Sequence, residues 1–64
     1  MNNLIVRSAL LETGVRAWQV ARDILKVSEP TYFRMMRNEM PEDEQIRIAN
    51  LIKDFAKNGG QEHE

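Results

Sequence analysis

Two short segments decide the fold of this 64-residue chain: residues 16–25, RAWQVARDIL, and residues 28–38, SEPTYFRMMRN. The first segment carries an apolar stripe at helical spacing, formed by Ala17, Val20, Ala21 and Ile24. In the second segment, the side-chain oxygen of Ser28 can cap a helix, and Pro30 falls in the first turn, where a missing N–H costs nothing. The pattern predicts helices over about 16–25 and 29–38, separated by a tight turn.

Longer helices are expected on both sides of this pair. Apolar residues at about 3.6-residue spacing predict a helix over 2–12, closed by Gly14: Leu4, Ile5, Val6, Ala9, Leu10 and Leu11. Pro41 fits the first position of a fourth helix, and the acidic residues 42–44 suit the dipole of its first turn. The apolar face of that helix is expected to hold Ile48, Leu51, Ile52 and Phe55. Residues 1–58 should therefore form a compact, all-α, four-helix domain, followed by a disordered tail over 59–64.

Composition limits the class of protein. Nine Lys/Arg and ten Asp/Glu give a formal charge of -1, and 42% of the residues are hydrophobic, which is ordinary for a soluble globular chain. A domain this small has a thin core, and with no Cys it has neither disulfides nor a Cys-based zinc site. Residues 1–7 lack the apolar run of a signal peptide, and no stretch approaches the roughly 20 apolar residues of a membrane span. We expect a cytoplasmic protein with no membrane partner.

The central pair of helices meets the requirements of a DNA-binding helix-turn-helix. Its first helix crosses the second steeply, so that one contact position must be small, and Ala21 fits it. Val20 and Ile24 would anchor the crossing, and Val27 would pin the turn to the core. On the second helix, the inward residues would be Tyr32 and either Met35 or Met36, with Tyr32 and Met35 as the anchors. The N-terminal side of that helix is then left free for the major groove.

The same residues carry a family resemblance. Gln19-Val20-Ala21 followed by Val27–Arg34 (VSEPTYFR) resembles the helix-turn-helix of the lambda-repressor/Cro-like (XRE) family. Residues 27–41 and the acidic run after them are similar to small proteins of phages and mobile elements in Gram-positive bacteria. The resemblance covers about residues 4–57. It implies a lambda-repressor-like fold and sequence-specific binding of double-stranded DNA by a small transcriptional regulator, with residues 29–38 as the recognition helix.

One feature departs from the family pattern. The family spaces the small Ala and the capping Ser by six residues, with a Gly in the turn. Here Ala21 and Ser28 are seven apart, and Leu25-Lys26 stands where Gly is expected. Either the helix over 16–25 is one residue longer, or the register shifts so that Arg22 occupies the small position. We favour the first, because an Arg at the helix crossing would clash or be buried without a partner.

Position by position, the resemblance assigns DNA contacts to ten residues: Arg16, Gln19, Lys26, Ser28, Glu29, Pro30, Thr31, Phe33, Arg34 and Arg37. It puts Glu29, Pro30, Phe33, Arg34 and Arg37 on the outward face. Arg34 is the best candidate for a base contact, since its fork can pair with guanine O6 and N7. Arg16, Gln19, Lys26 and Arg37 would hold phosphates, which position a protein without specifying a sequence. Thr31 would meet a thymine methyl or a phosphate, and Glu29 would accept from cytosine N4 or cap the helix.

The charge is unevenly distributed along the chain. From residue 16 to residue 37 there are five basic and two acidic residues, a net +3. Residues 41–64 carry three basic and six acidic residues, a net -3. The overall acidity therefore belongs to the C-terminal part, and DNA binding would rest on a local basic surface rather than on a large field.

An enzymatic function is not expected. Glu42, Asp43 and Glu44 are consecutive, so on a helix they point in different directions, and stabilisation of the helix dipole explains them better than acid/base or metal chemistry. His63 is the one His and lies in the tail, away from any Ser that it could activate. We expect no cofactor, no metal and no small-molecule substrate.

Two expectations concern partners. A module this small binds DNA weakly, so we expect a homodimer that reads two half-sites, with Ile48, Ile52 and Phe55 of the fourth helix and the nearby Met residues as its surface. The alternative function is a protein-interaction module on the same fold that grips a partner protein instead of DNA. Phe33, Met36 and the acidic tail motivate this alternative.

Overall fold

The computed structural model describes residues 2–58, and these form four helices and no strand. They are α1 (Leu4–Thr13), α2 (Ala17–Gln19), which η1 (Val20–Leu25) continues as a π-helical turn, α3 (Glu29–Arg37) and α4 (Glu42–Lys57). The all-α class and the expected order of four helices are confirmed for these residues. The tail predicted to be disordered, 59–64, lies outside the described residues. No helix within 2–58 has the length and apolar character that a membrane crossing needs.

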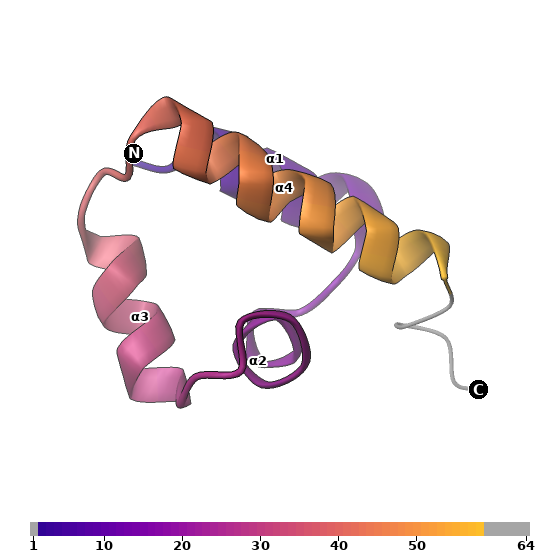
Figure 1. The fold of residues 1–64 in the computed structure, drawn as a ribbon, viewed down its shortest axis with the longest axis horizontal. Coiled ribbons are helices and arrows are strands. Elements are labelled where there is room, and N and C mark those ends of the chain that lie inside the picture. The colour runs from indigo at the N-terminus through magenta and orange to yellow at the C-terminus, as the bar shows by residue number, and fades with distance from the viewer. Residues whose placement is uncertain (1, 59–64) are drawn as a thin grey trace.

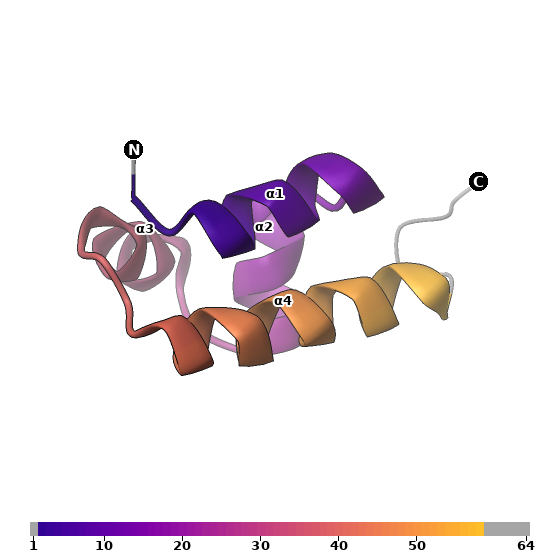
Figure 2. The ribbon, with the colours of Figure 1, turned by 90° about the horizontal axis from the view of Figure 1, so that it is seen from above.

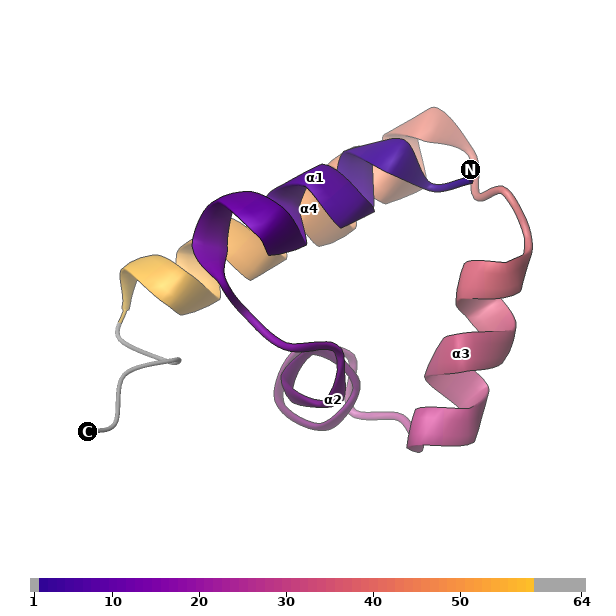
Figure 3. The same cartoon turned by 180° about the vertical axis from the view of Figure 1, so that it is seen from behind.

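The longest helices, α1 and α4, lie side by side and run in the same direction (Figure 1, Figure 3). The backbone N–H of Ile5 donates to Gln45 Oε1 at 3.2 Å near one end of the pair, and Lys53 Nζ lies 3.8 Å from Glu12 Oε1 near the other. In Figure 1 the continuous helix of α2 and η1 is seen end-on, whereas α3 is seen from the side. Figure 2 shows that α2 crosses the α1–α4 pair. In the same view α3 lies at the end of this pair where α1 begins.

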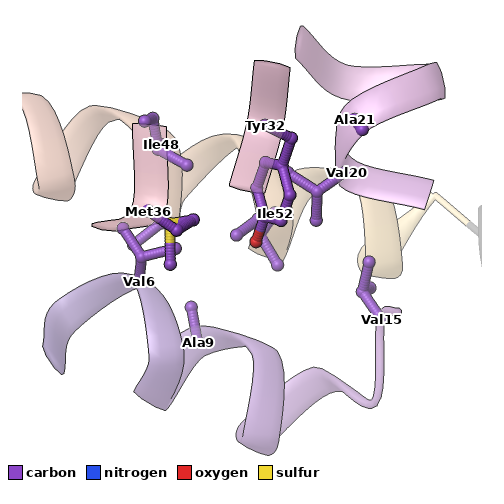
Figure 4. Packing of buried hydrophobic residues seen from close by; sticks show 10 residues of the cluster. Val6, Ala9, Val15, Val20, Ala21, Tyr32, Met36, Ile48 and Ile52 are labelled. Atoms are coloured by element: carbon purple, nitrogen blue, oxygen red, sulfur yellow. The ribbon is translucent and has the colours of Figure 1, made fainter. Parts of the chain in front are cut away.

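All four helices contribute to one core (Figure 4). Tyr32 and Met36 project from α3, with Tyr32 beside Val20 and Ile52, and Met36 beside Val6. The buried apolar residues are Val6, Ala9, Val15, Val20, Ala21, Tyr32, Met36, Ile48, Ala49 and Ile52. Val27 in the turn packs against this cluster as predicted.

Some apolar residues of the predicted helices lie outside the core, and the inward positions predicted for Leu51 and Met35 are wrong. Leu4 and Leu11 are 57% and 86% exposed, because α1 buries only the stripe that faces α4 and α3. Leu51 is 37% exposed on α4, and on α3 the buried methionine is Met36 rather than Met35. Ile48 and Ile52, expected at a dimer surface, are 1% and 0% exposed, because they fill the core of their own chain. They cannot form that surface while the domain is folded.

The ends of α1 follow from backbone conformation. The helix begins two residues later than predicted, since Asn3 has φ 55° and cannot belong to a right-handed helix. At the other end Gly14 has φ 78° and its N–H donates to the Leu10 carbonyl at 2.8 Å, which confirms it as the cap. The fourth helix begins at Glu42, with Pro41 as the residue before its first turn rather than within it.

The extra residue between Ala21 and Ser28 is taken up by the π-helical turn. The N–H of Lys26 donates to the Ala21 carbonyl five residues earlier, and the N–H of Val27 donates to the same carbonyl at 2.8 Å. Ala21 is fully buried and Arg22 is exposed, which is the burial that the first of the two alternatives expects. Lys26, at φ 59°, adopts the left-handed conformation that Gly usually provides.

Candidate nucleic-acid interface

The first turn of α3 is built by residues next to it in the sequence. Ser28 Oγ accepts a hydrogen bond from the Thr31 N–H at 3.3 Å, and its hydroxyl donates to Thr31 Oγ1 at 2.9 Å. Pro30 lies in the first turn and Glu29 adds negative charge there, where the helix dipole favours it. The predicted cap is confirmed, and both hydroxyls are engaged with each other at an exposed site.

The outer face of α3 carries four exposed residues at i, i+3, i+4 and i+7: Pro30, Phe33, Arg34 and Arg37. We call them the outer stripe. Tyr32 and Met36 occupy the opposite, buried face. Since residues at this spacing share one side of a helix, α3 presents one aromatic ring, one proline and two guanidinium groups to solvent. Glu29, the fifth residue predicted to face outward, is also exposed.

Phe33 makes an aromatic contact with its neighbour Tyr32. The Phe33 ring meets the Tyr32 ring edge-on, with the centroids 5.4 Å apart and the planes at 64°. Tyr32 is only 3% exposed and is part of the core. Burial raises the pKa of the Tyr32 phenol, an effect that the positive charge of Arg7 partly opposes. Tyr32 thus gives the exposed Phe33 ring an aromatic contact that belongs to the core.

The other predicted contact residues are placed around α3 and α2. Lys26 is exposed just before Ser28, and Arg16 is exposed at the residue before α2. Gln19 is only 6% exposed, and its Oε1 accepts a hydrogen bond from the Arg16 N–H at 2.9 Å. Its side-chain oxygen therefore caps α2 from inside the fold. Thr31 is half-buried and bonded to Ser28.

The basic residues of this region differ in their engagement. Arg22 contacts Asp23 Oδ1 at 3.3 Å and lies over the Trp18 ring at 4.8 Å. Among residues 2–58, the ion pairs use Arg22, Arg47 and Lys53, and none involves Lys26, Arg34 or Arg37. The guanidinium groups of the outer stripe can therefore donate hydrogen bonds to an external anion or to a nucleic-acid base without breaking an internal ion pair.

The C-terminal end of α3 is held by residues from the beginning of the chain. Asn2 Nδ2 donates to the Arg37 carbonyl at 2.6 Å. Asn3 Nδ2 donates to the carbonyls of Met36 and Asn38 at 3.1 and 2.9 Å. These bonds satisfy carbonyls that a helix end leaves without partners. Asn3 is fully buried, so its amide is a part of the interior.

Glu39 and Gln45 complete this network, which we call the α3 clamp (Asn2, Asn3, Glu39 and Gln45). Glu39 Oε1 accepts from the Asn3 N–H, and Glu39 Oε2 accepts from Gln45 Nε2, both at 2.9 Å. Gln45 Nε2 also donates to the Met40 carbonyl at 2.8 Å, and the Met40 N–H donates to Asn3 Oδ1 at 2.8 Å. The bonds from Asn3 and then Gln45 lower the pKa of the Glu39 carboxyl.

The clamp was missed in the sequence, although one signal for part of it was present. Gln45 stands three residues before Ile48, on the inward stripe of α4, and a polar residue at such a position needs a buried partner. Nothing local identifies that partner as the α3–α4 connection or relates Asn3 to it. The network therefore depends on tertiary placement.

Acidic residues do not assemble into a second kind of site. Within residues 2–58 no three His, Cys, Asp or Glu side chains are placed to hold a metal ion together. Glu42, Asp43 and Glu44 occupy the first turn of α4, and Glu44 pairs with Arg47 at 2.6 Å. His63 lies outside the described residues.

Comparisons of the chain with protein-family models, with curated proteins and with solved structures found no match. A functional assignment therefore depends on the geometry and chemistry of the residues described above.

Proposed function

We propose that this protein binds double-stranded DNA sequence-specifically, as a small transcriptional regulator. In this proposal α2 with η1 and α3 act as a helix-turn-helix in a lambda-repressor-like arrangement, and α3 enters the major groove. The outer stripe carries the proposal: an exposed helix face with two arginines and one aromatic ring, free of internal ion pairs among residues 2–58. Further support comes from the short connection between η1 and α3, residues 26–28, and from Ala21 buried at the crossing.

Each residue of the proposed interface has a role that suits its chemistry. Arg34 donates to guanine O6 and N7, since its fork matches both acceptors. Lys26, Arg37 and Arg16 bind phosphates on either side of the groove. Glu29, exposed at the first turn of α3, accepts from cytosine N4 when it reaches a base. Gln19 acts indirectly, by holding the backbone of Arg16.

The charge of the protein sets the expected strength of this binding. The formal charge of the whole chain is -1, whereas residues 16–37 carry a net +3. A few phosphate contacts on a weakly charged protein give modest affinity and a shallow dependence on salt. We therefore also propose that two copies bind together and read half-sites about 34 Å apart. Among the described residues, Ile46 and Leu51 are the exposed large apolar side chains of α4 that self-association could cover.

The test is a titration of labelled duplexes, first selected from a randomised pool, against increasing salt. We expect Arg34→Ala to weaken binding to the selected duplex by about 1–3 kcal/mol and to relax the preference at one base pair. Lys57→Ala, which removes a cation near the end of α4, is the matched control and should leave that preference unchanged. Absence of binding to any duplex at about 50 mM salt, where phosphate contacts are strong, would contradict the proposed DNA binding.

A second candidate function, capture of a partner protein, is favoured by two exposed aromatic rings. Phe33 is 52% exposed on α3 and Trp18 is 44% exposed on α2. Aromatic and Arg side chains are enriched at protein interfaces, so the outer stripe also suits this function. The salt titration separates the two candidates, because only DNA binding predicts a duplex affinity that falls steadily with salt.

A further inference from the structure

Phe33 has an unusual setting for a large apolar side chain. It belongs to the outer stripe and is 52% exposed, with Arg34 and Arg37 on the same side of the helix. The Phe33 ring makes an edge-on contact with the buried Tyr32 ring. That contact limits the orientations of the ring, which lowers the side-chain entropy lost when it binds an apolar group.

We propose that Phe33 is a specificity-determining residue that contacts the C5-methyl group of a thymine in the major groove. The inference rests on the proposed DNA binding and adds a base preference to it. Of the four bases, only thymine presents an apolar group in that groove, and aromatic side chains are suitable partners for it. Arg34 lies on the same outer stripe and suits guanine, so the selected site is expected to contain both a guanine and a thymine.

Charge favours DNA over an apolar pocket of another protein as the occupant. At helical spacing the neighbours of Phe33 on the exposed side are Glu29, Pro30 and Arg37, while Arg34 is next in the chain and Lys26 lies just before the helix. The one acidic residue of α3 is Glu29, in its first turn. A duplex offers phosphates to the cations and a methyl group to the ring within one groove.

The experiment compares thymine with uracil, which differs only by the missing methyl group. A duplex is first selected from a pool with a randomised core, and each thymine of the selected site is then replaced singly by deoxyuridine. At one position we expect the Kd of the full-length protein to rise about fourfold, the factor that one buried methyl group is worth. In Phe33→Ala the ratio of the two Kd values at that position should fall to about one, since the side chain that senses the methyl is gone.

Control variants keep the test independent of folding. Phe33→Leu preserves an apolar side chain and should retain part of the ratio, and helicity measured by circular dichroism shows that each variant is folded. Leu11→Ala removes an exposed apolar side chain from α1, away from the outer stripe, and should leave the full ratio. A selected duplex whose affinity is insensitive to every uracil, or a ratio that survives in Phe33→Ala, overturns the inference while DNA binding stands. A pool that yields no selected duplex removes both.

Discussion

The two ends of α3 are held in different ways. At its N-terminal end, Ser28 and Thr31 bond to each other within a single turn, at an exposed site. At its C-terminal end, Asn2 and Asn3 bond to carbonyls 33 to 35 residues away in the chain, and the Asn3 side chain is buried. The first end depends on local sequence, whereas the second depends on the whole fold being assembled.

This difference bears on the proposed recognition helix. The N-terminal cap decides where α3 begins, and the α3 clamp attaches its other end to α1 and α4. Asn2 and Asn3 bond to Arg37 and Asn38, at the connection between α3 and α4 and at the far end of α3 from its cap (Figure 1). The direction in which the outer stripe points is therefore set from outside the helix. Substitutions at the two ends should separate these contributions.

We expect the largest loss of stability from a substitution at the C-terminal end of α3, where the Asn3 side chain is buried. Asn3→Ala removes the amide that bonds to Met36, Asn38 and Met40, and it leaves those backbone groups without partners in the interior. It also places Ala at φ 55°, a conformation that favours Asn or Gly. We expect the free energy of unfolding to fall by about 3 kcal/mol, measured by urea denaturation followed by circular dichroism.

Two further variants separate the causes of the stability lost in Asn3→Ala. Asn3→Gly tolerates the left-handed backbone, so its loss does not include the cost of an alanine Cβ at φ 55° and reports the missing amide together with the entropy of glycine. Asn50→Ala, on the exposed face of α4, is the matched control and should change stability by less than about 0.5 kcal/mol. Wild-type stability in Asn3→Gly would show that the α3 clamp contributes nothing through its amide.

A smaller effect is expected at the exposed end. Ser28→Ala removes the acceptor of the Thr31 N–H and should lower the free energy of unfolding by about 1 kcal/mol in the same measurement. Ser8→Ala, in the middle of α1 and exposed, should change it by less than about 0.5 kcal/mol. If Ser28→Ala were to cost as much as Asn3→Ala, the contrast between a local cap and a buried network would be wrong.

The same contrast explains what could be predicted from the sequence. The caps at Ser28 and Gly14 depend on residues within one or two turns, and the pattern predicted them. The exposed positions of the outer stripe were expected from the family resemblance. The choice of Met36 over Met35 and the exposure of Leu11 depend on where another helix packs. Periodicity defines an apolar side of a helix, but it does not say how much of that side has a neighbour.

The turn before α3 lies between these extremes. Compared with the family pattern, the chain has one more residue between Ala21 and Ser28, and the burial argument correctly predicted that Ala21 is buried and Arg22 is not. The means by which the chain absorbs that residue, a π-helical turn followed by Lys26 at φ 59°, has no signature in the residue types. Lys is not a usual left-handed residue, so its type alone does not predict this conformation.

The smallest change in stability is expected for Glu39→Gln, because Glu39 is the exposed member of the α3 clamp. The bonds from Asn3 and Gln45 lower its pKa below the ordinary value of 4.5. A carboxyl whose pKa is lower in the folded than in the unfolded chain stabilises the fold above the unfolded-state pKa. That stabilisation is lost as the pH falls through the folded-state pKa. In Glu39→Gln the deficit in unfolding free energy at pH 7 should therefore shrink below about pH 4.5.

Urea denaturation at pH 7 and at pH 3 measures this deficit, and an NMR titration of the Glu39 side chain measures its pKa directly. Asp54→Asn, an exposed substitution on α4, corrects for the loss of one negative charge. In Gln45→Leu one of the two bonds to the carboxylate is removed, so the pKa of Glu39 should move back toward 4.5. A Glu39 pKa that is ordinary in the parent and unmoved in Gln45→Leu would mean that the carboxylate is not held by the clamp in solution. The second end of α3 would then depend on the two asparagines alone.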